Sequence, residues 1–177
     1  MKKFTVVFIA LMTLNLVAPC SYAKRDAKLR RTSQEAIELL TSTDPGLEHW
    51  FKEAYGYAIF PTIGKAGFWI GGAFGKGEVY EKGKFLGEAR LTQGSVGFQW
   101  GGQAYVEVIF FENERNLENF KDSNFALSAQ ASAVAAAEGA AANAKYEHGV
   151  AVFTVAKGGI MLEASVGGQK FKYLPKD

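Results

Sequence analysis

The first quarter of the chain carries apolar side chains at the three- and four-residue intervals that are typical of an α-helix. This pattern predicts one helix over residues 24–43 and a second over residues 44–56. Asp44 and Pro45 mark the start of the second helix, because aspartate caps helices and proline suits the first helical position. The apolar residues of the two helices are Leu29, Ala36, Ile37 and Leu40, then Leu47, Trp50, Phe51 and Ala54.

After residue 56 the pattern changes to short apolar and aromatic runs separated by glycine, as in β-strands. The run over 103–111 is apolar on both faces apart from Glu107, as expected of a strand covered on both sides. Residues 81–84 indicate a hairpin turn, and residues 113–121 a short helix between strands. The predicted strands are 57–60, 67–74, 77–80, 85–91, 95–100, 103–111, 150–156, 160–166 and 169–173.

The segment 125–144 has two interpretations. Its alanine content favours a helix, whereas Ser128, Gln130 and Ser132 alternate with apolar residues as they would in a strand. We predict a strand over 125–136 and a loop beyond Glu138, with a helix as the alternative.

Together these elements predict an α+β fold. It has two N-terminal helices, one short helix between strands, and a largely antiparallel sheet that is strongly bent or partly closed into a barrel. The glycines between Tyr57 and Tyr80 favour bending, because glycine lets a strand curve or approach a neighbouring backbone closely. Residues 24–177 are expected to form a single domain, with a β-rich core over 57–177.

Residues 1–23 have the features of a secretory signal peptide. Two lysines precede an apolar run from Phe4 to Ala18, and a small-x-small sequence ends at Ala23, after which we expect cleavage. A lipoprotein signal that uses Cys20 is the alternative, although Pro19 stands where a small residue is expected. The protein is therefore expected to be periplasmic or associated with the outer membrane.

Cleavage at this position changes the charge and the cysteine content. It removes two lysines, so that Lys and Arg become equal in number to the 18 acidic residues, and it removes the single cysteine. A neutral chain does not indicate nucleic-acid binding, which usually requires strong basic clustering. A chain without cysteine has no disulfide and no thiolate ligand for a metal.

Motifs for catalysis are missing from the sequence. The phosphate-binding motif G-x-x-x-x-G-K-[ST] is incomplete here, because Ile70 replaces its first glycine and Gly77 replaces its final serine or threonine. His49 and His148 lack the spacing of zinc ligands. Glu107 is the one acid whose pKa burial is expected to raise, although such a residue is more often paired or turned outward. We expect no enzyme activity, no cofactor and no metal.

The remaining candidate chemistry is apolar surface beside basic side chains. Aromatic and basic side chains are favoured at a lipid interface, because tryptophan and lysine can place their apolar part in the lipid and their polar end in water. A solvated helix start and a plain aromatic core are the alternative interpretations of the same residues. The candidate lipid-binding residues are Lys24, Arg25, Lys28, Arg30, Arg31, Lys65, Trp69, Phe74 and Lys76.

Three ordered motifs between Leu47 and Tyr173 resemble the SYLF-domain family of lipid-binding proteins. They are GYAIFPTIGKAGFWIGGAFGKG, LTQGSVGFQWGGQAYVEVIFF and HGVAVFTVAKGGIMLEASVGGQKFKY. The resemblance implies an α+β domain whose eukaryotic relatives bind phosphoinositide-containing membranes, partly through a basic amphipathic helix before the β region. The matching helix here is 24–40.

The chain departs from the eukaryotic members before the second motif. Gly87-Glu88-Ala89-Arg90 replaces their tryptophan–proline pair, so actin binding is not expected. We predict a non-enzymatic protein that binds anionic phospholipid or a membrane surface in the cell envelope. The alternative is a structural or adaptor protein that binds an envelope protein, and an enzyme acting on envelope lipids ranks third because no catalytic constellation is present.

Overall fold

A computed structural model describes residues 18–66, 71–95, 104–122, 125–127, 133–157 and 168–176, with no side-chain detail for 18–26, 65, 66, 71 and 95. The helices of the described ranges are α1 (Ala18–Thr43), α2 (Leu47–Glu53), α3 (Glu114–Lys121) and α4 (Ala140–Asn143). The strands are β1 (Gly56–Ala66), β2 (Gly71–Glu81), β3 (Lys84–Ser95), β4 (Ala104–Phe111), β5 (Val134–Ala135), β6 (Val150–Ala156) and β7 (Lys170–Pro175).

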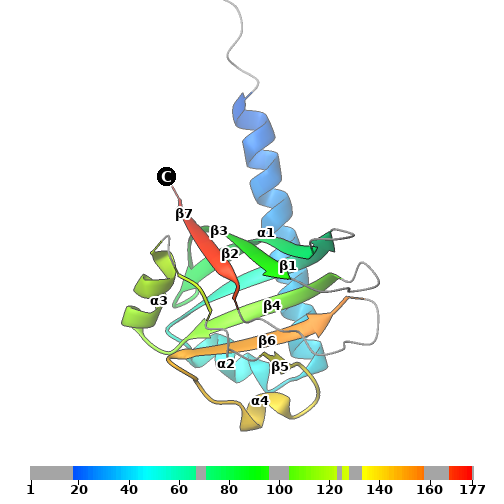
Figure 1. Ribbon diagram of the computed structural model, residues 1–177, viewed down its shortest axis with the longest axis vertical. Helices are drawn as coiled ribbons and strands as arrows, with labels where there is room; N and C mark the ends of the chain where they lie inside the picture. The colour runs from blue at the N-terminus through cyan, green and yellow to red at the C-terminus, as the bar shows by residue number, and fades with distance from the viewer. Residues whose placement is uncertain are drawn as a thin grey trace, which may run out of the picture.

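The strands form one bent sheet in the order β5-β6-β4-β1-β2-β3-β7 (Figure 1). All neighbours are antiparallel except β5 and β6, which are parallel. The sheet is not closed, since β5 and β7 lie at its two ends. The predicted α+β fold with a bent, largely antiparallel sheet is confirmed.

One bulge in β1 contributes to the bend. The register of β1 shifts between Ile59 and Thr62 against β2, and between Phe60 and Ile63 against β4. Pro61 lies inside this irregularity, where its missing N–H costs no ladder hydrogen bond. An extra residue in one strand increases the local twist, so the sheet curves at this point.

Strand β4 is buried along almost its whole length and separates two apolar clusters. Val108 and Phe110 pack with Leu40 of α1 and Leu47 of α2 on one face. Ile109 and Phe111, together with the side chains of α3 and β7, form the cluster on the other face. This two-sided burial explains why the strand shows no polar face in the sequence.

The junction between α1 and α2 is held by a buried carboxylate. Asp44 is 1% exposed; its Oδ1 accepts a hydrogen bond from Gly46 N at 3.0 Å, and its Oδ2 accepts one from Ala141 N at 2.7 Å. The residue that caps α2 is Gly46, so the second helix is shorter than the predicted 44–56. Asp44 instead ties this turn to α4.

Several strand predictions need correction. Residues 71–74 and 77–80 of the two predicted strands belong to one strand, β2, whose glycines do not interrupt it, and residues 67–70 lie outside the described residues. A Cβ at Gly77 would collide with the carbonyl oxygen of Ile59, so glycine here permits a close approach to β1. The turn at 81–84 is confirmed, with positive φ at Lys82 (46°) and Gly83 (77°).

The predicted strand 125–136 is wrong for most of the segment that the structure describes. Ala126 forms an isolated bridge with Lys170, and only Val134 and Ala135 form a strand. The loop expected beyond Glu138 contains the short helix α4. The alternation was carried largely by alanine, whose small side chain provides little apolar area to fix a strand. Residues 128–132, together with most of 95–100 and all of 160–166, lie outside the described residues.

Candidate functional site

A groove of about 580 Å³ lies between α1 and the sheet, over strands β1 to β3. Its lining combines three basic side chains with apolar and hydroxyl groups. The lining residues are Lys28, Leu29 and Thr32 from α1, Pro61 and Thr62 from β1, Phe74, Gly75 and Lys76 from β2, and Arg90, Leu91 and Thr92 from β3.

The pairing of β2 with β3 places two positive charges beside one aromatic ring. Lys76 is directly opposite Arg90, and Phe74 is directly opposite Thr92. Residues two apart in a strand share a face, so Phe74 and Lys76 point to the same side of the sheet. Lys28, from α1, supplies a third positive charge to the same groove.

The three basic side chains have no acidic partner among the ion pairs of the described residues. Like charges directly opposite each other in a sheet are destabilising, and Lys76 and Arg90 form such a pair. An anion bound between them would relieve this repulsion. The groove is therefore suited to a phosphate or carboxylate group.

Phe74 is 58% exposed, more than any other large hydrophobic side chain in the described part of the chain. A Cβ at Gly72 would lie 3.0 Å from Phe74 Cε2, so the glycine leaves room for the ring. An exposed phenylalanine beside unpaired positive charge offers both contacts that an anionic amphiphile needs.

Helix α1 forms one wall of the groove and continues past the sheet at its N-terminal end (Figure 1). Its C-terminal half is anchored by Ala36 and Leu40, which are buried. Two of its predicted binding residues have other partners. The Arg30 guanidinium carbon lies 5.6 Å from the centre of the Phe85 ring, and Arg31 Nε lies 3.5 Å from Glu35 Oε1.

The structure thus brings together three of the predicted lipid-binding residues, namely Lys28, Phe74 and Lys76. Arg90 belongs with them and was missed. The side chains of Lys24, Arg25 and Lys65 are not described, and Trp69 lies outside the described residues.

Arg90 was missed because of an irregularity in the hairpin. Tyr80 pairs with Phe85, but Val79 pairs with Gly87, so the register shifts by one residue between them. Counting back from the turn would place Ala89 opposite Lys76. The shift moves Arg90 to that position and onto the groove face.

Glu107 lies on the opposite face of the sheet from Val106 and Val108, inside the core. It is fully buried, and Gln169 Nε2 donates a hydrogen bond to its Oε2 at 2.9 Å. Burial raises the pKa of Glu107 to about 8, and the hydrogen bond from Gln169 lowers it in part. Three buried oxygens nearby, Glu107 Oε1, Thr154 Oγ1 and Gln169 Oε1, have no hydrogen-bond partner among the residues that the structure describes.

Two further observations bear on the kind of site. Within the described ranges, no group of three or more His, Cys, Asp or Glu side chains is placed to hold a metal ion. None of the helices in these ranges has the length and apolar character needed to cross a membrane.

Comparison with known proteins gives two matches. The family model described as Las17-binding protein actin regulator (Ysc84) matches residues 92–173. The chain is also 29% identical over 151 residues to Beta cell expansion factor A of Aeromonas veronii, an alignment that covers 80% of this chain and 54% of that protein. The chain thus spans about half the length of this curated relative. The two matches agree with the resemblance of the three motifs to the SYLF-domain family, and the family model places this similarity in residues 92–173.

Proposed function

We propose that this protein is a non-enzymatic lipid-binding protein of the cell envelope, which holds anionic phospholipid head groups in the groove between α1 and the sheet. The observation that carries this proposal is the pairing of Lys76 with Arg90 beside the exposed ring of Phe74. The chemistry of the groove, three cations and one exposed apolar side chain, matches a phosphate group attached to an acyl chain.

The strength of attachment to an anionic membrane can be estimated from the side chains of the groove. Each basic side chain near an anionic bilayer contributes about 1 kcal/mol, so Lys28, Lys76 and Arg90 together supply about 3 kcal/mol. Insertion of Phe74 adds roughly 1.5 kcal/mol, because only part of its surface leaves water. The sum corresponds to weak, reversible attachment of one protein molecule to an anionic membrane.

The leader predicted at residues 1–23 supports an envelope location and, with it, a bacterial anionic phospholipid as the ligand. A protein partner at the same groove is the second candidate, because an exposed aromatic ring beside basic residues also suits an acidic protein surface.

Flotation of the purified protein with vesicles tests the proposal. We expect binding to vesicles that contain phosphatidylglycerol, no binding to phosphatidylcholine alone, and loss of binding as salt is raised. Phe74→Ala should weaken binding about tenfold, whereas Phe74→Leu should retain most of it, since leucine keeps an apolar side chain.

Two results would count against a lipid ligand. A folded protein that floats with neither vesicle would contradict lipid binding. A crosslinked protein adduct in intact envelopes that depends on Phe74 and persists without anionic lipid would favour the protein partner.

A further inference from the structure

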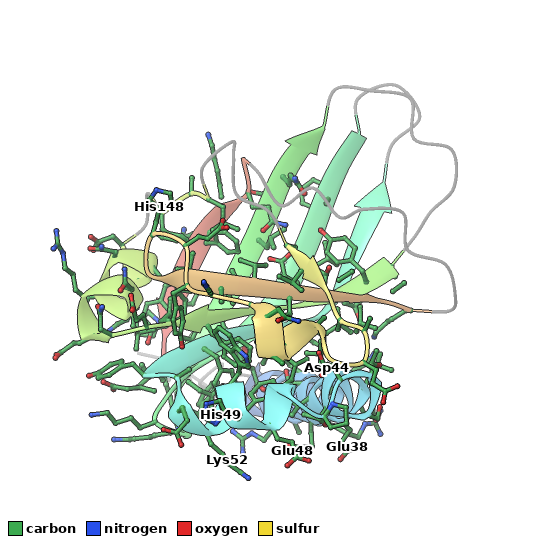
Figure 2. The ribbon with its side chains drawn as sticks, turned by 90° about the horizontal axis from the view of Figure 1, so that it is seen from below. Glu38, Asp44, Glu48, His49, Lys52 and His148 are labelled. Atoms are coloured by element: carbon green, nitrogen blue, oxygen red, sulfur yellow. The ribbon has the colours of Figure 1, made fainter. Side chains whose placement is uncertain are left out.

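A second cavity, of about 800 Å³, lies beside β6 and shares no lining residue with the groove. Residues of α3, of the segment 125–127, of the segment 143–148 and of β6 surround it. His148, one of its lining residues, lies on the other side of β6 from Asp44 and His49 (Figure 2). The cavity is therefore distinct from the groove between α1 and the sheet.

Its wall is apolar and comes from both ends of the sheet. Leu127 exchanges backbone hydrogen bonds with the residues that lead into β7, whereas Val134 pairs with β6. Val150 and Val152 of β6 and Phe125 complete the wall. Apolar side chains from the two sheet edges thus face one space, which provides a surface for an apolar ligand body.

Its rim carries hydrogen-bonding groups with balanced charge. Asn116 and Asn119 of α3, and Asn143 of α4, bring three amides to the cavity, and Lys145 and Glu147 contribute one charge of each sign. The amides of Asn119 and Asn143 are exposed and make no hydrogen bond with the described residues. They are free to donate to and accept from a ligand.

The turn at 147–150 fixes one side of this rim. Glu147 and Val150 exchange backbone hydrogen bonds of 2.8 and 3.1 Å around His148 and Gly149, which have φ values of 54° and 80°. Glu112 N donates to Gly149 O at 3.1 Å, and Asn116 Nδ2 donates to His148 O at 3.4 Å. The turn is thus tied to the end of β4 and to α3, so the rim is formed before any ligand binds.

We propose that this cavity is a second binding site, which takes an uncharged amphiphile with an apolar body and a head group rich in hydroxyl groups. The volume is in the range of small-molecule sites, and the apolar wall with a few convergent polar groups is their usual composition. Amide groups suit hydroxyl groups, because an amide both donates and accepts hydrogen bonds. The rim carries one positive and one negative charge, so it does not favour a charged head group. The three basic side chains of the groove, in contrast, favour an anionic one.

Titration with octyl glucoside below its micelle-forming concentration tests the site, with octyl sulfate as the charged counterpart. Calorimetry gives the affinity, and amide NMR shifts locate the ligand. We expect one saturable site for octyl glucoside, with shifts in residues 116–119, 125–127 and 143–152, and weaker binding of octyl sulfate at this position.

Two variants and one control sharpen the result. Replacing Asn119 and Asn143 together by alanine should weaken octyl glucoside binding about tenfold, because two exposed amides are lost without disturbing the core. Ala126→Trp, at an exposed lining position, should block binding by filling the mouth. Lys76→Ala, which changes the groove and not the cavity, should leave the affinity for octyl glucoside unchanged.

Some outcomes would overturn this proposal. They are non-saturable uptake of octyl glucoside, shifts confined to the groove, or an unchanged affinity in both cavity variants when NMR shows them folded. Failure here would leave vesicle binding through the groove intact, so the two proposals are tested separately.

Discussion

Between pH 5 and pH 8 the free energy of unfolding should fall by about 3 kcal/mol on account of Glu107 alone, and Glu107→Gln should remove this fall. Burial raises the pKa of Glu107 in the folded protein to about 8, against an ordinary value of 4.5. Between these values the folded state keeps a proton that the unfolded state has released.

The direction in which the free energy of unfolding changes with pH follows from this difference in bound protons. Stability from a neutral Glu107 is fully present below pH 4.5, falls as the pH rises, and is lost once the pH passes about 8. Glutamine has nearly the same shape and does not ionise, so Glu107→Gln should be more stable than the wild type at pH 8 and close to it at pH 5.

Urea unfolding at several pH values, followed by circular dichroism, measures this effect. Glu53→Gln is the matched control, because the same change at an exposed carboxyl in α2 should leave the pH dependence of the wild type in place. If Glu107→Gln loses stability between pH 5 and pH 8 as steeply as the wild type, Glu107 is not a neutral buried acid.

The second large effect concerns binding. Replacing Lys76 and Arg90 together by glutamate should lower affinity for phosphatidylglycerol vesicles at least hundredfold. Each reversal removes one favourable charge and adds an unfavourable one, and each charge near the membrane surface is worth about 1 kcal/mol. Vesicle co-sedimentation at fixed salt measures the loss.

The single variant Lys76→Glu separates binding from stability. It would place a carboxylate directly opposite Arg90, so a cross-strand repulsion becomes an attraction worth roughly 0.2–1 kcal/mol. We expect Lys76→Glu to unfold at the same or a higher urea concentration while it binds vesicles more weakly. A parallel loss of both properties would mean that the charge pair serves the fold.

The sequence predicted those elements whose apolar pattern is long and unambiguous. The helix 24–43 has enough apolar positions to define a stripe, and the structure shows it within α1. Strand β4 was predicted because it is apolar on both faces, and the turn at 81–84 was also predicted; Gly83 has a positive φ there.

The errors have specific physical causes. The glycines of β2 suggested breaks, but Gly77 permits close contact with β1. The groove was only partly foreseen, because Lys28 and Lys76 were chosen from composition and local spacing. Arg90 joins them through a one-residue register shift between Val79 and Tyr80, which hydrogen bonding and packing across strands determine and no local pattern encodes.

Burial of the groove face against a membrane can be measured at one position. Thr92 is exposed and directly opposite Phe74, so a nitroxide on Thr92→Cys, in a Cys20→Ser background, reports contact at the groove. We predict that phosphatidylglycerol vesicles will shield this label from a water-soluble relaxation agent, while a label at Glu53 stays accessible. Vesicle-bound protein whose label at residue 92 is as accessible as in free protein would contradict binding through the groove.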